Sequence, residues 1–253
     1  MMNRFVFAVS MLLASAFVFA APDTLSVPVG NSSELSLTGI WWPKSTKVKK
    51  SQKAKRVNAV HSNDAQTPVV VWFHGGMGSG NCAKGLVAGS SFAELYPEKI
   101  VVSLSACREN HWVTKGMVDA VDAALDSVAA RRKSPVERVS LVGVSDGSLG
   151  VLIYSLEGRR SVDDRLLVSS FGKLLGEARA IAGANDARMR LGRWRFLQGG
   201  KDRLYPSEQT VPWIESFCGG VQSDCALRFD PEGEHDWSYW KGKHLEWIRE
   251  ATP

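Results

Sequence analysis

The chain has 253 residues, 44% of them hydrophobic and 23% charged, which is the composition of a globular protein with one large or two small domains. This balance excludes a disordered chain, a collagen and a coiled coil. The formal net charge of +5 and the pI near 9.1 would suit a nucleic-acid partner only if the basic residues were spread over the folded body of the protein.

The only long apolar stretch lies at the N-terminus, from residue 5 to residue 21, and it follows Arg4. A single stretch of this kind excludes a multi-span membrane protein. A basic start, an apolar run and small residues around Ala20 and Ala21 are the parts of an export signal in their usual order. We therefore expect a signal peptide over 1–20, a domain over 21–253, and a secreted or periplasmic location. An uncleaved membrane anchor is the alternative, because the stretch is at the lower limit for spanning a bilayer.

Two weakly apolar segments, 24–29 and 35–42, are the first strands that the sequence predicts. Between Lys44 and Arg56 there follow seven basic residues and no acidic one. Without these seven, the chain after residue 20 carries a net charge of −3, so its body is not basic and nucleic acid is not an expected partner. Because the segment lacks large apolar residues, we expect 44–67 to be a solvated, flexible loop; contact with an anionic surface or polymer is the alternative.

From residue 68 onward, continuous apolar runs alternate with helical patterns. The runs, which are typical of strands buried on both faces, are 69–73, 100–104, 139–144, 166–169, 194–197 and 226–229. The helical patterns are 84–95, 113–131, 147–156, 206–217 and 239–250. This alternation predicts an α/β protein with a mostly parallel central sheet and helices on both faces. The spacing leaves no room for a large lid domain.

The strand at 139–144 runs into Gly143-Val144-Ser145-Asp146-Gly147, a G-x-S-x-G sequence followed by a helical pattern. In a nucleophile elbow the serine occupies a strained turn between strand and helix, where the two glycines avoid contact with neighbouring backbone. The motif alone is weak, but the strand before it and the helix after it strengthen the prediction that Ser145 is a nucleophile.

A glycine-rich loop follows the strand at 69–73 and begins His74-Gly75-Gly76-Met77. Such a loop can turn a backbone N–H inward, so we expect Gly76 or Met77 to share an oxyanion hole with the amide of Asp146. A dinucleotide-binding loop is the alternative, since 78–83 fit a relaxed G-x-G-x-x-A. The next strand, however, does not end in the acidic residue that would hold a ribose.

A serine nucleophile needs a base and a residue that orients the base. Asp202 follows the strand at 194–197, and His235 follows the last strand, so both lie at the sheet edge that carries Ser145. The resulting order along the chain is Ser145, Asp202, His235.

Other histidines and aspartates are weaker candidates for these roles. His111 is the rival base, because it follows another strand at the same edge. Asp230 and Asp236 rank below Asp202, being too close in sequence to His235 to face its ring. We expect His74 to orient backbone, Asp146 to start a helix, His244 to be solvated, and His61 to lie in the basic loop.

The four cysteines of an exported chain are expected to form disulfides. Cys218 and Cys225 bracket a short flexible segment that a bond would close. Cys82 and Cys107 each follow a predicted strand, and these two strands could be neighbours in the sheet. Cys82 and Cys107 therefore form the second predicted pair. A zinc site is disfavoured because neither the cysteines nor the histidines have ligand spacing.

The residues 74–76, 143–147, Asp202 and His235 together resemble an α/β-hydrolase, over about three quarters of the chain. Within that superfamily, the chain looks most similar to exported feruloyl or acetyl-xylan esterases and polyhydroxybutyrate-depolymerase-like esterases. The features that carry this likeness are the export signal, the lidless form, and residues 110–112 and 233–240. The early strands and the basic loop are departures from this resemblance. Trp112 and Trp237 fall in loops at the predicted active edge and could contact substrate, although a role in roofing the sheet is the simpler interpretation.

The resemblance implies a serine hydrolase that cleaves small-molecule or polymer-linked carboxylic esters without a cofactor or metal. Two alternatives remain. A prolyl-oligopeptidase-like serine peptidase shares the order of the triad, and a non-catalytic exported binding protein could retain the fold. Fold does not decide among them, and the sequence does not indicate the acyl group, the alcohol or the oligomeric state.

Overall fold

The computed structural model describes residues 21–31, 33–43, 67–76, 78, 80–107, 110–172 and 186–253. The predicted signal peptide at 1–20, the basic loop as far as residue 66, and Met77 lie outside the described residues. Among the helices that can be described, none is long and apolar enough to cross a membrane.

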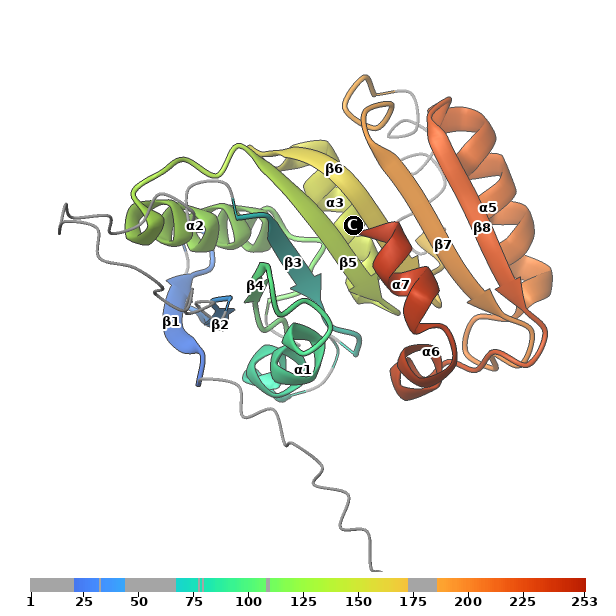
Figure 1. Ribbon diagram of the computed structural model, residues 1–253, viewed down its shortest axis with the longest axis horizontal. Helices are drawn as coiled ribbons and strands as arrows, with labels where there is room; N and C mark the ends of the chain where they lie inside the picture. The colour runs from blue at the N-terminus through green and yellow to red at the C-terminus, as the bar shows by residue number, and fades with distance from the viewer. Residues whose placement is uncertain are drawn as a thin grey trace, which may run out of the picture.

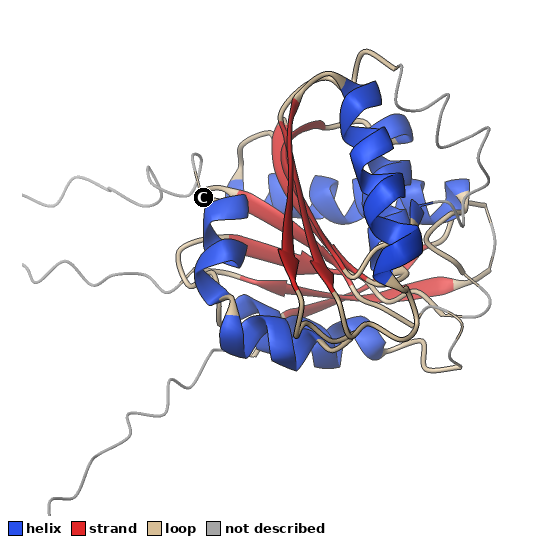
Figure 2. Cartoon of the chain, turned by 90° about the vertical axis from the view of Figure 1, so that its right-hand side faces the viewer, coloured by secondary structure: helices blue, strands red, loops and turns tan. Residues whose placement is uncertain are grey.

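An eight-stranded sheet forms the centre of the protein, with helices on both sides (Figures 1 and 2). The strands are β1 Asp23–Pro28, β2 Leu35–Trp41, β3 Val69–Phe73, β4 Ile100–Ser103, β5 Arg138–Val144, β6 Ser161–Val168, β7 Arg193–Gly199 and β8 Asp224–Asp230. Their spatial order is β1-β2-β4-β3-β5-β6-β7-β8. β2 pairs antiparallel with β1 and β4, and all the other pairs are parallel. The carboxyl ends of β3 to β8 therefore meet along one edge, where loops carry function in such sheets.

The described helices divide between the two faces of the sheet. They are α1 Lys84–Ala93, α2 Lys115–Arg132, α3 Gly147–Glu157, α5 Ser207–Val221, α6 Trp237–Lys243 and α7 Leu245–Ala251. One apolar core holds the buried side chains of α2, α3 and α5, and the other holds those of α1, α6 and α7. β3 shows why: Val69, Val71 and Phe73 belong to the first core, whereas Val70 and Trp72 belong to the second. An uninterrupted apolar run is thus explained by burial on both faces.

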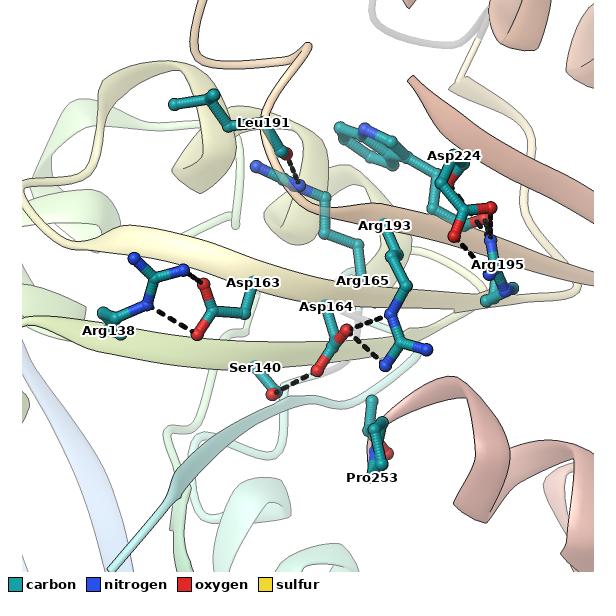
Figure 3. A network of polar contacts seen from close by, with 12 residues as sticks. Arg138, Ser140, Asp163, Asp164, Arg165, Leu191, Arg193, Arg195, Asp224 and Pro253 are labelled. Atoms are coloured by element: carbon teal, nitrogen blue, oxygen red, sulfur yellow. Dashed lines mark hydrogen bonds and ion pairs between the residues drawn. The ribbon is translucent and has the colours of Figure 1, made fainter. Parts of the chain in front are cut away.

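Strand β6 begins five residues earlier than the apolar pattern predicts, at Ser161 rather than 166. Its first half is polar because a network of ion pairs crosses the starts of β5 to β8 (Figure 3). Asp163 pairs with Arg138, and Asp164 is bonded to Arg193 at 2.7 Å and to the Ser140 hydroxyl at 3.3 Å. Because these polar residues are paired, they can lie within a strand, and β6 therefore extends beyond the apolar run that hydropathy alone predicts.

The predicted helix at 239–250 is two helices. The chain leaves helical geometry at His244, with φ −128° and ψ 34°. The ring of His244 bonds through Nε2 to Asp230 Oδ2 at 2.5 Å and stacks on Trp247. The expectation that His244 is solvated was therefore wrong, because the ring is drawn inward by a carboxylate at the end of β8.

Both predicted disulfides are present, Cys82 with Cys107 and Cys218 with Cys225. The first joins the start of α1 to the loop after β4, and the second joins the end of α5 to the start of β8.

Candidate active site

Ser145 lies in a sharp turn between β5 and α3 and has a positive φ of 54°. A side chain at Gly147 would overlap the carbonyl oxygen of Phe73, and one at Gly143 would come within 2.5 Å of the carbonyl oxygen of Gly147. The amide of Ser145 donates to the carbonyl of Val168 on β6 at 2.9 Å, which anchors the turn. This is the geometry of a nucleophile elbow, and it holds a non-glycine residue in a conformation that costs free energy.

The side chains of Ser145, His235 and Asp202 form a continuous chain of hydrogen bonds. His235 Nε2 lies 2.8 Å from Ser145 Oγ, and His235 Nδ1 lies 2.8 Å from Asp202 Oδ2 and 3.0 Å from Oδ1. With the proton on Nδ1, the ring donates to the carboxylate and Nε2 is left to accept from the serine hydroxyl. The structure thus brings together the three residues that the sequence places at one sheet edge.

Backbone hydrogen bonds hold the loops of Asp202 and His235 against each other. Gly200 donates to the carbonyl of Asp230, and Lys201 donates to the carbonyl of Gly233, each at 2.9 Å. Because these bonds join the loops that follow β7 and β8, the aspartate and the histidine are positioned as one unit.

The carboxyl of Asp202 is fully buried. Burial alone would raise its pKa, but the hydrogen bond from His235 and those from the backbone of Tyr205 and Leu204 outweigh burial and hold the pKa below its ordinary value. The two backbone amides donate to Oδ1 at 2.8 and 3.0 Å. Asp202 is therefore ionised at neutral pH and can stabilise a positively charged His235.

The loop after β3 passes directly beside Ser145. A Cβ at Gly75 would lie 3.1 Å from the Ser145 Cβ, and Gly76 has a positive φ of 66°. The ammonium group of Lys84, the first residue of α1, lies against Gly76, so a side chain there would have to displace it. The glycine loop therefore borders the nucleophile at Gly75, and binding of an oxyanion by the amide of Gly76 or Met77 stays a prediction; Met77 lies outside the described residues.

The structure places Trp112 in the core, with 1% of its surface exposed and its indole N–H donating to the carbonyl of His74 at 2.9 Å. Burial argues against the substrate contact considered for Trp112 and agrees with the simpler interpretation, a structural role, because its indole bond holds the start of the glycine loop. Trp237 is half-buried and packs on Trp72 and Phe92 with ring centroids 5.0 and 6.1 Å away. A contact of Trp237 with substrate stays a prediction.

The two other candidate aspartates have other partners. Asp230 accepts hydrogen bonds from Tyr239 and His244, and Asp236 caps α6 by accepting from the amide of Ser238. His61, the fifth histidine, lies outside the described residues. Neither Asp230 nor Asp236 is hydrogen-bonded to the His235 ring, whose Nδ1 is bonded to Asp202.

Asp146 starts α3, as expected, but its side chain makes no capping hydrogen bond. It accepts instead from the hydroxyl of Tyr205 at 3.0 Å. Sequence reasoning did not single out Tyr205. Its one signal is position, three residues after Asp202 in the same turn, which places its backbone amide on that carboxylate.

A cleft of about 890 Å³ opens beside His235. Its lining includes His235, the exposed Leu204 and the charged residues Lys201, Arg203, Glu208, Glu234 and Asp236.

No protein-family model matches the chain, and no curated protein does. Solved structures do match. A ferulic acid esterase aligns with a TM-score of 0.61 at 16% identity over 91% of this chain and 96% of that one. An S-formylglutathione hydrolase from Agrobacterium tumefaciens aligns with a TM-score of 0.60 at 14% identity over 91% of this chain and 94% of that one. An acylaminoacyl peptidase from Pyrococcus horikoshii aligns with a TM-score of 0.56 at 9% identity over 91% of this chain but 40% of its own length.

These likenesses, together with the strand order and the elbow, show that the chain has the α/β-hydrolase fold. The similar structures include esterases and serine hydrolases, as the sequence led us to expect.

Proposed function

We propose that the protein is an exported serine hydrolase that cleaves carboxylic esters through Ser145, His235 and Asp202. One observation carries the proposal: an elbow serine whose Oγ lies 2.8 Å from a histidine that is itself bonded to a buried carboxylate. The likeness to esterases supports the proposal at the level of fold.

In the proposed mechanism, Ser145 Oγ attacks the ester carbonyl carbon while its proton passes to His235 Nε2. The carbonyl oxygen becomes an oxyanion that accepts hydrogen bonds from the amides of Asp146 and of Gly76 or Met77. The intermediate then collapses and expels the alcohol, which takes the proton from His235. Water, deprotonated by the same ring, hydrolyses the acyl-enzyme and frees Ser145.

A serine peptidase is the second candidate, and the likeness to an acylaminoacyl peptidase favours it. The alignment covers 40% of that peptidase, so more than half of its chain has no aligned counterpart here. Export is proposed on the predicted signal peptide, and the two disulfides are consistent with an oxidising location.

The experiment is covalent labelling by a fluorophosphonate, followed by mass mapping of the labelled peptide. We expect label on Ser145 and none on a Ser145→Ala variant. Turnover of short p-nitrophenyl esters, feruloyl esters and matched peptide amides then separates esterase from peptidase. A protein that takes no label and hydrolyses none of these substrates would be the non-catalytic binding protein instead.

A further inference from the structure

Tyr205 contacts Asp202 and His235 of the proposed triad and Asp146, the residue that follows Ser145, although it is not part of the triad. The inference drawn from these contacts rests on the proposed function. Tyr205 lies between β7 and α5, in the turn that begins with Asp202, and its side chain is half-buried.

The backbone of Tyr205 organises the aspartate. Its amide donates to Asp202 Oδ1 at 2.8 Å, and its carbonyl accepts from the side-chain amide of Gln198 at 3.0 Å. The same nitrogen of Gln198 lies 3.4 Å from Asp202 Oδ2. Gln198, which is fully buried at the end of β7, therefore holds the turn and its carboxylate together.

The side chain of Tyr205 reaches His235 and the nucleophile elbow. Its hydroxyl donates to Asp146 Oδ1 at 3.0 Å. Its ring meets the His235 ring edge-on, with centroids 4.9 Å apart and an interplanar angle of 87°. Burial raises the pKa of Tyr205 to about 12, so the hydroxyl remains a donor at neutral pH.

The sheet explains why such a contact matters. Ser145 sits after β5, whereas Asp202 and His235 sit after β7 and β8, and β6 lies between the two groups. No strand pairing joins β5 directly to β7. The distance between Ser145 Oγ and His235 Nε2 thus depends on loops that different strands carry, and a displacement of about 1 Å can cost 100-fold in rate.

We propose that Tyr205 is a positioning residue that ties the loop of Asp202 and His235 to the nucleophile elbow through its hydrogen bond to Asp146. Its hydroxyl fixes the distance across β6, and its ring limits rotation of His235. Since this action is exerted through the triad and not on bound substrate, its loss lowers kcat and leaves KM nearly unchanged.

The test compares Tyr205→Phe, Asp146→Ala and the double variant in the full chain. Each single variant breaks the same hydrogen bond, so we expect each to lower kcat about tenfold with KM changed less than about twofold. The double variant should be no slower than the slower single variant. Asp146→Asn keeps an oxygen that can accept from Tyr205, and it should restore most of the rate that Asp146→Ala loses.

Tyr96→Phe is the matched control. The Tyr96 hydroxyl is also buried and bonded, to Thr252 at 2.5 Å, but it belongs to the opposite core, under α7. This variant should lower the melting temperature as Tyr205→Phe does and leave kcat unchanged. If Tyr205→Phe leaves kcat unchanged, raises only KM, or combines multiplicatively with Asp146→Ala, the positioning role is wrong.

Two measurements keep this inference separate from the proposed function. Fluorophosphonate labelling of the wild-type protein tests whether Ser145 is a nucleophile. The low-field NMR resonance of the His235 Nδ1 proton reports its bond to Asp202 whether or not the protein turns over any substrate. We expect that resonance in the wild-type protein and in Tyr96→Phe, and its broadening in Tyr205→Phe; an unchanged resonance in Tyr205→Phe overturns the inference.

Discussion

His74 Nε2 accepts a hydrogen bond from the backbone amide of Ala106 at 2.9 Å. Only an unprotonated nitrogen can accept, so the ring proton is on Nδ1, which donates to the carbonyl of Gly75, also at 2.9 Å. His74 thus ties the glycine loop to the segment after β4, beside the disulfide of Cys107. The predicted role of His74, orienting backbone near the nucleophile, agrees with these bonds.

Burial, reinforced by the charge of Lys84, lowers the pKa of His74 from 6.5 to about 4. The unfolded chain therefore binds a proton at His74 below about pH 6.5, whereas the folded protein binds it only near pH 4. The free energy of unfolding should be undiminished above pH 6.5, and His74 should lower it by about 3 kcal/mol as the pH falls to 4. Urea unfolding from pH 4 to 8 measures this loss. His74→Gln should remove it from the pH dependence, and parallel curves for the two proteins would contradict the prediction.

Substitutions in the triad should lower kcat by amounts that reflect cooperation among its members. We expect Ser145→Ala and His235→Ala each to cost about a million-fold, and Asp202→Asn about ten-thousand-fold. Combining Ser145→Ala with His235→Ala should cost no more than either alone. Steady-state kinetics on a short p-nitrophenyl ester provide the measurement, and losses that multiply would show that the residues do not act as a unit.

Gly147→Ala should prevent correct folding or lower the free energy of unfolding by about 3 kcal/mol or more, since the new methyl group would overlap the carbonyl of Phe73 on β3. Gly219, inside α5, is the matched control, because a methyl group there meets no atom within 4 Å. Gly219→Ala should stabilise the protein by about 0.5 to 1 kcal/mol, as alanine favours helix. Thermal unfolding followed by circular dichroism compares the two, and equal melting temperatures would refute the argument from close packing.

The two disulfides should differ in their effect on stability and on activity. In the chain-entropy model, removing the Cys82–Cys107 bond, with a sequence separation of 25, costs about 3 to 4 kcal/mol, and removing the Cys218–Cys225 bond, with a separation of 7, costs about 2 kcal/mol. The first bond also restrains the segment that bonds to His74, so the Cys82→Ser/Cys107→Ser variant should lose esterase activity as well. The Cys218→Ser/Cys225→Ser variant should lose stability alone, and a loss of kcat in that variant would count against this distinction.

The amino-acid sequence by itself determined the parallel core of the fold and the three residues of the proposed triad. Apolar runs such as 69–73 are long enough to be buried on both faces, and loops after parallel strands must meet at one edge. Local geometry also restricts the elbow, since glycine is needed on both sides of Ser145. These features depend on neighbours along the chain, so they leave a pattern in the sequence.

Only the tertiary structure decided the features that depend on partners far away in the chain. Four features rest on a contact with a residue far away in the chain: the polar first half of β6, the break at His244, the burial of Trp112 and the contacts of Tyr205. A hydrogen bond across 59 residues, such as that from Tyr205 to Asp146, has no periodicity to reveal it. It exists because the sheet brings the ends of β5 and β7 within reach of one tyrosine side chain, and folding alone creates that proximity.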